Sequence, residues 1–160
     1  MRTLIAYSSK HGATRDYAEA LARELSGEVV LVNLRENPSP DASSFDQVVI
    51  GSAIYAGQAQ KEVRDFCARN LASLKPKRLG LFICCWFPDQ AERQLQAAFP
   101  PELLASAVIK CALGGRITLG ELSFFERLAA KAVGVKGDAS RYSEESARRF
   151  AQALKAESSN

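Results

Sequence analysis

Short apolar runs typical of buried strands alternate with helical patterns along the whole chain, and this alternation is the feature that most limits its fold. Strands that alternate with helices are joined by right-handed crossovers, so neighbouring strands lie parallel and helices cover both faces of the sheet. We therefore expect an α/β fold, a three-layer sandwich around a five-stranded parallel sheet of order 2-1-3-4-5. The predicted strands are residues 3–7, 28–33, 46–52, 79–87 and 107–113. The predicted helices are residues 14–25, 59–71, 89–98, 119–133 and 143–154.

Length and composition predict one cytoplasmic domain. The 160 residues suit a single domain, which we expect to span residues 1–157. No apolar run approaches the roughly 18 residues that cross a bilayer, and the start of the chain lacks the longer apolar stretch of a signal peptide. The net charge of +3 is mild and spread along the chain, which argues against a nucleic-acid surface. The four cysteines lack metal-ligand spacing, so we expect buried thiols and no metal site.

The loop after the first predicted strand has the residue types of an anion site. Open α/β sheets bind ligands at the carboxyl ends of their strands, where the strand order reverses. Small residues in such a loop let backbone N–H groups approach an anion, and the following helix start adds partial positive charge. Neither the Walker loop nor the three-glycine dinucleotide fingerprint is present. The loop therefore predicts either a phosphate monoester site or an empty turn with a Ser/Thr cap. Its candidate binding residues are Ser8, Ser9, Lys10, His11, Gly12, Ala13 and Thr14.

Residues 5–18 resemble the FMN-phosphate signature of the flavodoxin-like family. The residues that match it in type and spacing are Tyr7, Ser9, Gly12, Thr14, Ala18 and Leu21, whereas Ala6 stands where the family prefers a bulkier residue. The resemblance implies a flavodoxin-like fold with FMN as the cofactor. It also implies that the backbone and hydroxyls of residues 9–14 cradle the phosphate. Lys10 or His11 could add charge, although a solvated loop side chain is the commoner role for each.

Two further loops are predicted to form the walls of the flavin ring. A flavin ring needs flat apolar or aromatic neighbours and backbone groups for its polar edge. The loop after the third strand resembles the family's second flavin loop, and its candidate residues are Ala53, Ile54, Tyr55, Ala56 and Gly57. The loop after the fourth strand offers Cys85, Trp86 and Phe87. Because neighbouring strand residues point to opposite faces, Trp86 or Phe87 faces the ligand while the other packs inward, and we favour Trp86.

The last third of the chain resembles the flavodoxin-domain branch that contains menaquinone-dependent protoporphyrinogen oxidase. The resemblance lies in Gly114-Gly115-Arg116, in residues 122–128 and in Gly137-Asp138. It implies an FMN-dependent oxidoreductase with a porphyrinogen donor and a quinone acceptor. One region departs from the branch, because residues 88–101 are compact where those oxidases carry a longer loop. Arg116 is a candidate to bind an anionic substrate, with solvation as the commoner alternative.

Other functions remain open from the sequence. A flavodoxin-type electron carrier without its own substrate would exchange electrons with a protein partner, but such carriers are typically acidic and this chain is mildly basic. A cofactor-free interaction domain is a third class. The predicted helix at 119–133, with basic neighbours to residue 136, could lie on the inner face of a membrane, although packing on the sheet is the commoner role of such a stripe. No protein acid or base stands out, so the catalytic residues stay unknown.

Overall fold

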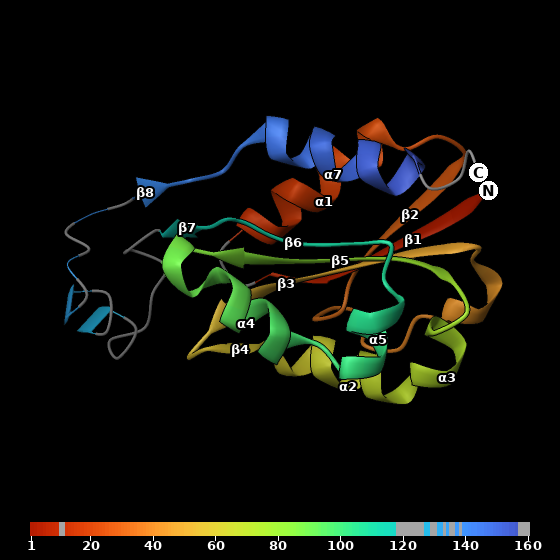
Figure 1. Ribbon diagram of the computed structural model, residues 1–160, viewed down its shortest axis with the longest axis horizontal. Coiled ribbons are helices and arrows are strands. Elements are labelled where there is room, and N and C mark those ends of the chain that lie inside the picture. The colour runs from red at the N-terminus through yellow and green to blue at the C-terminus, as the bar shows by residue number, and fades with distance from the viewer. Residues whose placement is uncertain are drawn as a thin grey trace.

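The computed structural model contains a parallel sheet whose strand order confirms the predicted topology (Figure 1). The structure describes residues 1–9, 12–117, 127–128, 131–132, 134, 137 and 139–156. The parallel strands run in the order β2-β1-β3-β5-β6. In chain order these strands are 2-1-3-4-5, as expected from the sequence. Their bounds are β1 (Arg2–Ser8), β2 (Glu28–Asn33), β3 (Gln47–Tyr55), β5 (Arg78–Cys85) and β6 (Ile109–Gly114).

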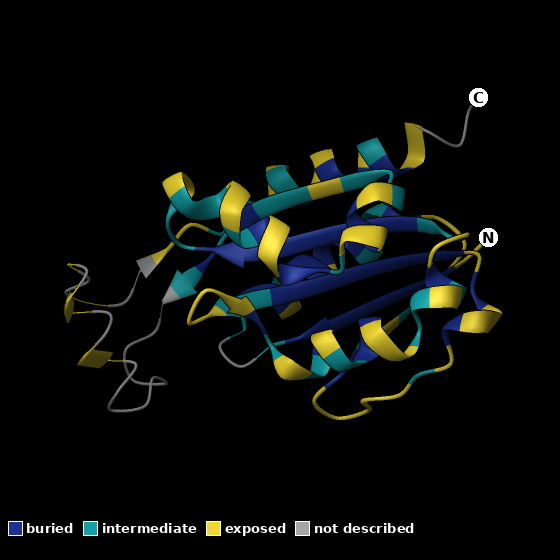
Figure 2. Ribbon diagram, turned by 60° about the horizontal axis from the view of Figure 1, so that its bottom comes forward, coloured by how far each residue is buried: buried dark blue, intermediate teal, exposed yellow. Residues whose placement is uncertain are grey.

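Helices cover both faces of this sheet and complete the three-layer sandwich (Figures 1 and 2). One face carries α1 (Ala13–Glu24) and α7 (Glu144–Ala156). The other face carries α2 (Lys61–Arg69), α3 (Leu71–Leu74), α4 (Ala91–Ala98) and α5 (Pro101–Ser106). Figure 2 shows the strands as a buried layer between helices whose outer sides are exposed.

Alternate residues of each central strand supply the two cores. On β5, Phe82 and Cys84 pack toward α1 and α7, whereas Leu81, Ile83 and Cys85 pack toward the opposite helices. This is the period-2 alternation of a strand buried on both faces. Apolar residues on both faces shield the sheet from water. They also pack against the helices and so hold them in place beside the strand ends.

The end of β3 differs from the sequence-based expectation. The strand continues to Tyr55 and folds back through Ala56 and Gly57 to pair antiparallel with β4 (Gln58–Ala59). Ala56 has φ 51° and Gly57 has φ 77°, so both turn residues take the positive φ of a two-residue hairpin. Residues 54–57 are therefore half strand and half tight turn rather than an open loop. The predicted helix at 59–71 correspondingly starts later, with α2 at Lys61.

Several short elements were not predicted from the sequence. Pro100-Pro101 not only stops α4 but also starts α5, because proline suits the first turn of a helix. Short 3-10 turns lie at Ala42–Ser44 and Pro88–Gln90. β7 (Arg116–Ile117) and β8 (Ala139–Ser140) pair as a separate two-stranded sheet.

The predicted helix at 119–133 lies mostly outside the described residues. Its described pairs, 127–128 and 131–132, are helical, and Leu128 is exposed. In the described part of the chain, no helix is long and apolar enough to cross a membrane. The same residues hold no group of three His, Cys, Asp or Glu side chains that could bind a metal ion.

The cysteines pack as thiols in or near the two cores. Cys67, Cys84 and Cys85 are buried and Cys111 is half-buried, and none of the four forms a disulfide. Burial raises the pKa of the Cys84 thiol to about 12 and that of Cys111 to about 11. The thiols therefore stay protonated at neutral pH.

Candidate functional site

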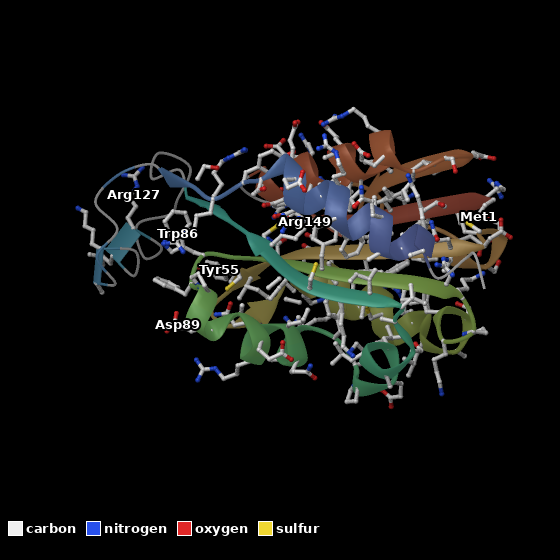
Figure 3. The ribbon with its side chains drawn as sticks, turned by 45° about the horizontal axis from the view of Figure 1, so that its top comes forward. Met1, Tyr55, Trp86, Asp89, Arg127 and Arg149 are labelled. Atoms are coloured by element: carbon white, nitrogen blue, oxygen red, sulfur yellow. The ribbon has the colours of Figure 1, made fainter. Side chains whose placement is uncertain are left out.

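The carboxyl ends of β1, β3, β5 and β6 meet at one edge of the sheet. The register pairs Ser8 with Ser52, Ala53 with Cys84, and Cys85 with Gly114. Figure 3 shows Tyr55, Trp86 and Asp89 at this end of the molecule. The sequence thus brings the three predicted binding segments to the same edge.

The turn from β1 into α1 presents backbone N–H groups at the start of a helix. Gly12, the residue before the helix, has φ 90° and no side chain with which to cap it. The first intrahelical bond is donated by the Asp16 N–H to the Gly12 carbonyl over 3.0 Å. The N–H groups of Ala13, Thr14 and Arg15 therefore have no acceptor within the helix. Ala13 and Thr14 are also buried, which makes this turn chemically suited to an anion.

Three side chains of this turn are directed at the protein itself. The Gly12 N–H donates to Ser9 Oγ over 3.0 Å, which closes the turn. Ser8 Oγ donates to Gln60 Oε1 over 2.5 Å and lies 3.3 Å from Glu62 Oε2. The Thr14 hydroxyl lies 3.5 Å from Cys84 Sγ. Lys10 and His11, the two predicted charged members, lie outside the described residues.

The hairpin of β3 and β4 holds the second predicted segment. Ser52 Oγ accepts from the Gln60 N–H over 3.0 Å and donates to the Ala53 carbonyl over 2.8 Å. These bonds tie the start of α2 to the end of β3. Ala53 and Ile54 are half-buried, and Tyr55 at the tip is 52% exposed.

The third predicted segment leaves β5 beside Gly115. Cys85 Sγ donates to Gln94 Oε1 of α4 over 2.8 Å, so this thiol faces the helix layer. Trp86 is half-buried, and the Arg141 guanidinium lies 4.6 Å from the centre of its ring. This distance suits a cation–π contact. Phe87 is also half-buried, and its carbonyl accepts from the Gln90 N–H over 3.1 Å.

The segment around Arg141 is fixed by backbone contacts. The Gly115 N–H donates to the Cys85 carbonyl over 3.1 Å, and the Arg141 N–H donates to the Gly115 carbonyl over 2.8 Å. A Cβ added to Gly114 would lie 2.0 Å from the Arg141 carbonyl oxygen, so this approach requires glycine. The chain after β8 therefore lies directly over the ends of β5 and β6.

Arg116 is placed beside the first turn. Its Nη1 lies 2.5 Å from Asp16 Oδ2, and its guanidinium lies 5.6 Å from the centre of the Tyr142 ring. A Cβ built on Gly12 would lie 3.8 Å from the same nitrogen. The guanidinium is thus paired with a carboxylate at the rim of the turn, and is not simply solvated.

Tyr17 links α1 to the segments on either side of it. Its hydroxyl donates to the Gly114 carbonyl over 2.9 Å and accepts from the Ser143 N–H over 3.1 Å. Burial raises the pKa of Tyr17 to about 12. The sequence alone did not single out Tyr17, Asp16, Gln60 or Arg141 as site residues. Asp16 and Gln60 closely follow predicted binding loops, and that position could have suggested them, whereas no local signal marks Arg141.

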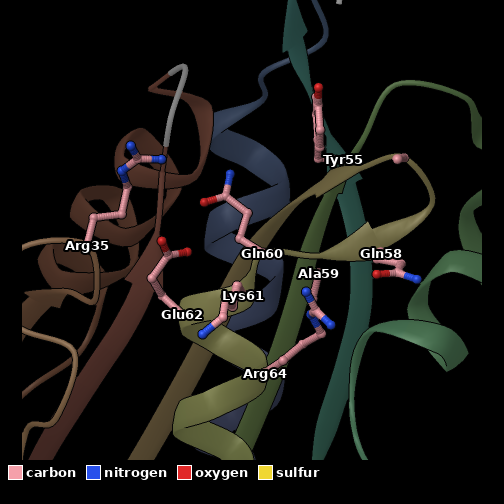
Figure 4. Close-up of a pocket in the computed structure, with 9 residues that line it drawn as sticks. Arg35, Tyr55, Gln58, Ala59, Gln60, Lys61, Glu62 and Arg64 are labelled. Atoms are coloured by element: carbon pink, nitrogen blue, oxygen red, sulfur yellow. The ribbon is translucent and has the colours of Figure 1, made fainter.

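A pocket of about 330 Å³ opens between the hairpin and the start of α2 (Figure 4). We call it the α2 pocket. It combines basic, amide and acidic side chains with the exposed Tyr55. The lining residues used below are Arg35, Tyr55, Gln60, Lys61, Glu62 and Arg64.

Comparison with known proteins identifies the family. A family model described as "Flavodoxin domain" matches residues 4–142. Over 77 residues the chain is 31% identical to Protoporphyrinogen IX dehydrogenase (quinone) of Escherichia coli K12. This match covers 46% of the chain and 42% of that protein, so it spans less than half of the relative's length.

Solved structures show the same fold. Oxidised Flavodoxin 2 from Bacillus cereus superposes with a TM-score of 0.58 at 19% identity, over 98% of this chain and 99% of that one. A flavoprotein from Lactobacillus acidophilus, solved in complex with FMN, gives 0.54 at 15% identity over 69% and 92%. The chain belongs to the flavodoxin-domain family of flavin-binding electron-transfer proteins, and FMN is the cofactor that this membership indicates.

Proposed function

We propose that this chain, as one domain over residues 1–157, binds FMN at the carboxyl edge of its sheet and works as an oxidoreductase with a quinone acceptor. The phosphate would lie against the turn at residues 8–14, and the ring would lie between the β3–β4 hairpin and the segment after β5. The observation that carries the proposal is the start of α1, where backbone donors without a helical acceptor are buried beside Gly12.

The start of α1 fits a phosphate monoester. An anion there would accept from the N–H groups that the helix leaves unpaired, and the helix dipole would favour its charge. Ser9 Oγ already accepts from Gly12 and keeps its own proton to donate. The Thr14 hydroxyl contacts Cys84, so we assign Thr14 to the site through its backbone N–H.

We assign the walls of the flavin ring to two aromatic residues, Tyr55 and Trp86. The register pairs Ala53 with Cys84, and Tyr55 and Trp86 each follow two residues later in the chain. The exposed Tyr55 ring and the half-buried Trp86 ring could each cover a face of the isoalloxazine. Backbone groups of Ala53, Ile54, Ala56, Gly57, Cys85 and Phe87 complete the predicted set.

The chain itself supplies binding and orientation. FMN, when bound, supplies hydride or single-electron chemistry. Asp16 is paired with Arg116, and Glu62 lies beside the Ser8 hydroxyl. Neither carboxylate is placed as an independent proton donor, so we assign no general acid or base among the described residues.

We infer the class of the electron donor from the Escherichia coli relative. That protein is named as a protoporphyrinogen IX dehydrogenase that uses quinone, and the 31% identity over 77 residues favours a related oxidation here. The mildly basic charge of +3 also favours a small anionic donor over the basic protein partners of acidic carriers. An electron carrier without its own substrate is the alternative, and the full-length match to flavodoxins favours it.

Two measurements test the proposal. Titration of the purified chain with FMN should give a saturable visible-absorbance change and quench the flavin fluorescence. The loaded protein should then reduce a menaquinone analogue when protoporphyrinogen is supplied and not without it. Binding of FMN without donor-dependent quinone reduction would favour the carrier, and no FMN binding would overturn the proposed function.

A further inference from the structure

The basic side chains that line the α2 pocket outnumber the carboxylates that neutralise them. Arg35, Lys61 and Arg64 line it together with one carboxylate, Glu62. Lys61 is already paired with Asp65 at 2.6 Å. Among the described residues, no carboxylate forms an ion pair with the guanidinium of Arg35 or of Arg64. Two guanidinium groups are therefore available to an anionic ligand at this pocket.

The floor of the pocket is held by a polar network. Ser8 Oγ donates to Gln60 Oε1 and approaches Glu62 Oε2, while the Gln60 N–H donates to Ser52 Oγ. Figure 4 shows Gln60 and Glu62, in that view, between Arg35 and Tyr55. The pocket is thus anchored to the ends of β1 and β3, which also carry the proposed flavin site.

We propose that the α2 pocket binds the carboxylate of the small molecule that exchanges electrons with the flavin. This inference rests on the proposed function, because Tyr55 lines the pocket and is also a proposed wall of the flavin ring. A carboxylate held at the pocket would keep the body of its molecule beside that ring. The proposal extends the site from the cofactor to its reaction partner.

A small carboxylate, rather than the FMN phosphate, is the occupant that suits the pocket. The planar guanidinium binds a carboxylate through two parallel hydrogen bonds. A volume of about 330 Å³ suits a small-molecule group. We assign the FMN phosphate to the start of α1 instead, because the helix leaves backbone N–H groups without an acceptor there and Ala13 and Thr14 are buried.

Calorimetric titration of the FMN-loaded protein tests the proposal with two matched probes. Anthraquinone-2-carboxylate carries the anion, and 2-(hydroxymethyl)anthraquinone is its uncharged analogue. We expect the carboxylate to bind more tightly than the uncharged analogue. The double variant Arg35→Gln/Arg64→Gln should reduce this affinity ratio about tenfold. The uncharged analogue should bind both proteins equally.

A second double variant controls for net charge. Arg93→Gln/Arg149→Gln removes the same charge from exposed positions on α4 and α7 and should leave the preference intact. Retention of the preference in Arg35→Gln/Arg64→Gln, or its loss in the control, would overturn the proposal.

Titrations with FMN and riboflavin separate the remaining outcomes. Both ligands should bind Arg35→Gln/Arg64→Gln as they bind the unaltered chain. A loss confined to FMN would assign the pocket to the phosphate and overturn the carboxylate site. If the unaltered chain takes up no FMN, the proposed function fails; an Arg-dependent carboxylate preference in the same protein would then still support the pocket as an anion site.

Discussion

Arg116 and Asp16 face each other across the rim of the turn that starts α1, with 2.5 Å between Nη1 and Oδ2. The pair joins the first residue of β7 to the first turn of α1, which are 100 positions apart in the chain. Each side chain is about one-third exposed, so the pair adds about 1 kcal/mol or less to stability. Its more specific effect is electrostatic, because Asp16 neutralises a cation that borders the proposed phosphate site.

Removing the charge of Arg116 and removing that of Asp16 should change FMN affinity in opposite directions. Arg116→Gln leaves the Asp16 carboxylate unpaired near the phosphate, so we expect FMN to bind about three- to tenfold more weakly. Asp16→Asn leaves the Arg116 charge unpaired, so FMN should bind more tightly. Fluorescence titration measures both, and riboflavin, which lacks the phosphate, should respond little. Equal losses for both variants would show that the pair acts through folding alone.

Gly12→Ala should weaken both the fold and the phosphate site. At φ 90° an L-residue is strained by about 1 kcal/mol or more. Gly134, at φ 89° with no atom within 4 Å of a built Cβ, provides a matched control. Urea unfolding should show a similar loss for Gly12→Ala and Gly134→Ala, whereas only Gly12→Ala should lose FMN affinity. An equal loss of FMN affinity in both would remove the assignment of this turn.

The sequence was sufficient for the sheet because the central strands are buried on both faces. Residues 47–50 and 79–83 are all buried, and Gln47 is the only polar residue among them. Tertiary contacts therefore reinforce the strand signal there. The order of the strands then followed from the alternation with helices.

Edge features were harder to predict because their signals are non-local. An alanine gives no sequence signal for a positive φ, so the hairpin that turns at Ala56 after Tyr55 was not predicted. The contact of Arg141 with Trp86 joins residues 55 positions apart, and no local pattern links them. The same holds for Arg116, whose partner Asp16 lies in the first helix.

Trp86 should report flavin binding directly. It is the sole tryptophan of the chain, so intrinsic tryptophan emission comes from this residue. If its ring lines the flavin site, added FMN should quench that emission in step with the visible-absorbance change. Trp86→Leu should bind FMN about tenfold more weakly, and Trp86→Phe should retain most of the affinity because stacking survives. Full binding with unchanged emission would place the ring wall elsewhere, with Phe87 the next residue to test.

Alkaline pH should destabilise the fold partly through Tyr17. Its pKa is about 12 in the fold against 10.0 for the free side chain, because burial disfavours the phenolate. The unfolded chain therefore loses this proton first, and the stabilisation present below pH 10 falls between pH 10 and pH 12. One pKa unit is worth 1.36 kcal/mol, so the loss is on the order of 2–3 kcal/mol.

Urea unfolding between pH 7 and pH 11 separates Tyr17 from the other buried acids. Buried thiols also ionise above pH 9 in the unfolded chain, so the unaltered protein should lose stability from about pH 9 upward. Tyr17→Phe should be less stable at pH 7, because the Gly114 carbonyl and the Ser143 N–H each lose a partner. It should also lose less stability than the unaltered chain from pH 10 to pH 11. Parallel stability curves for the two proteins over that interval would mean that the Tyr17 phenol titrates alike in both states, and its hydroxyl would then act on the fold only through its two hydrogen bonds.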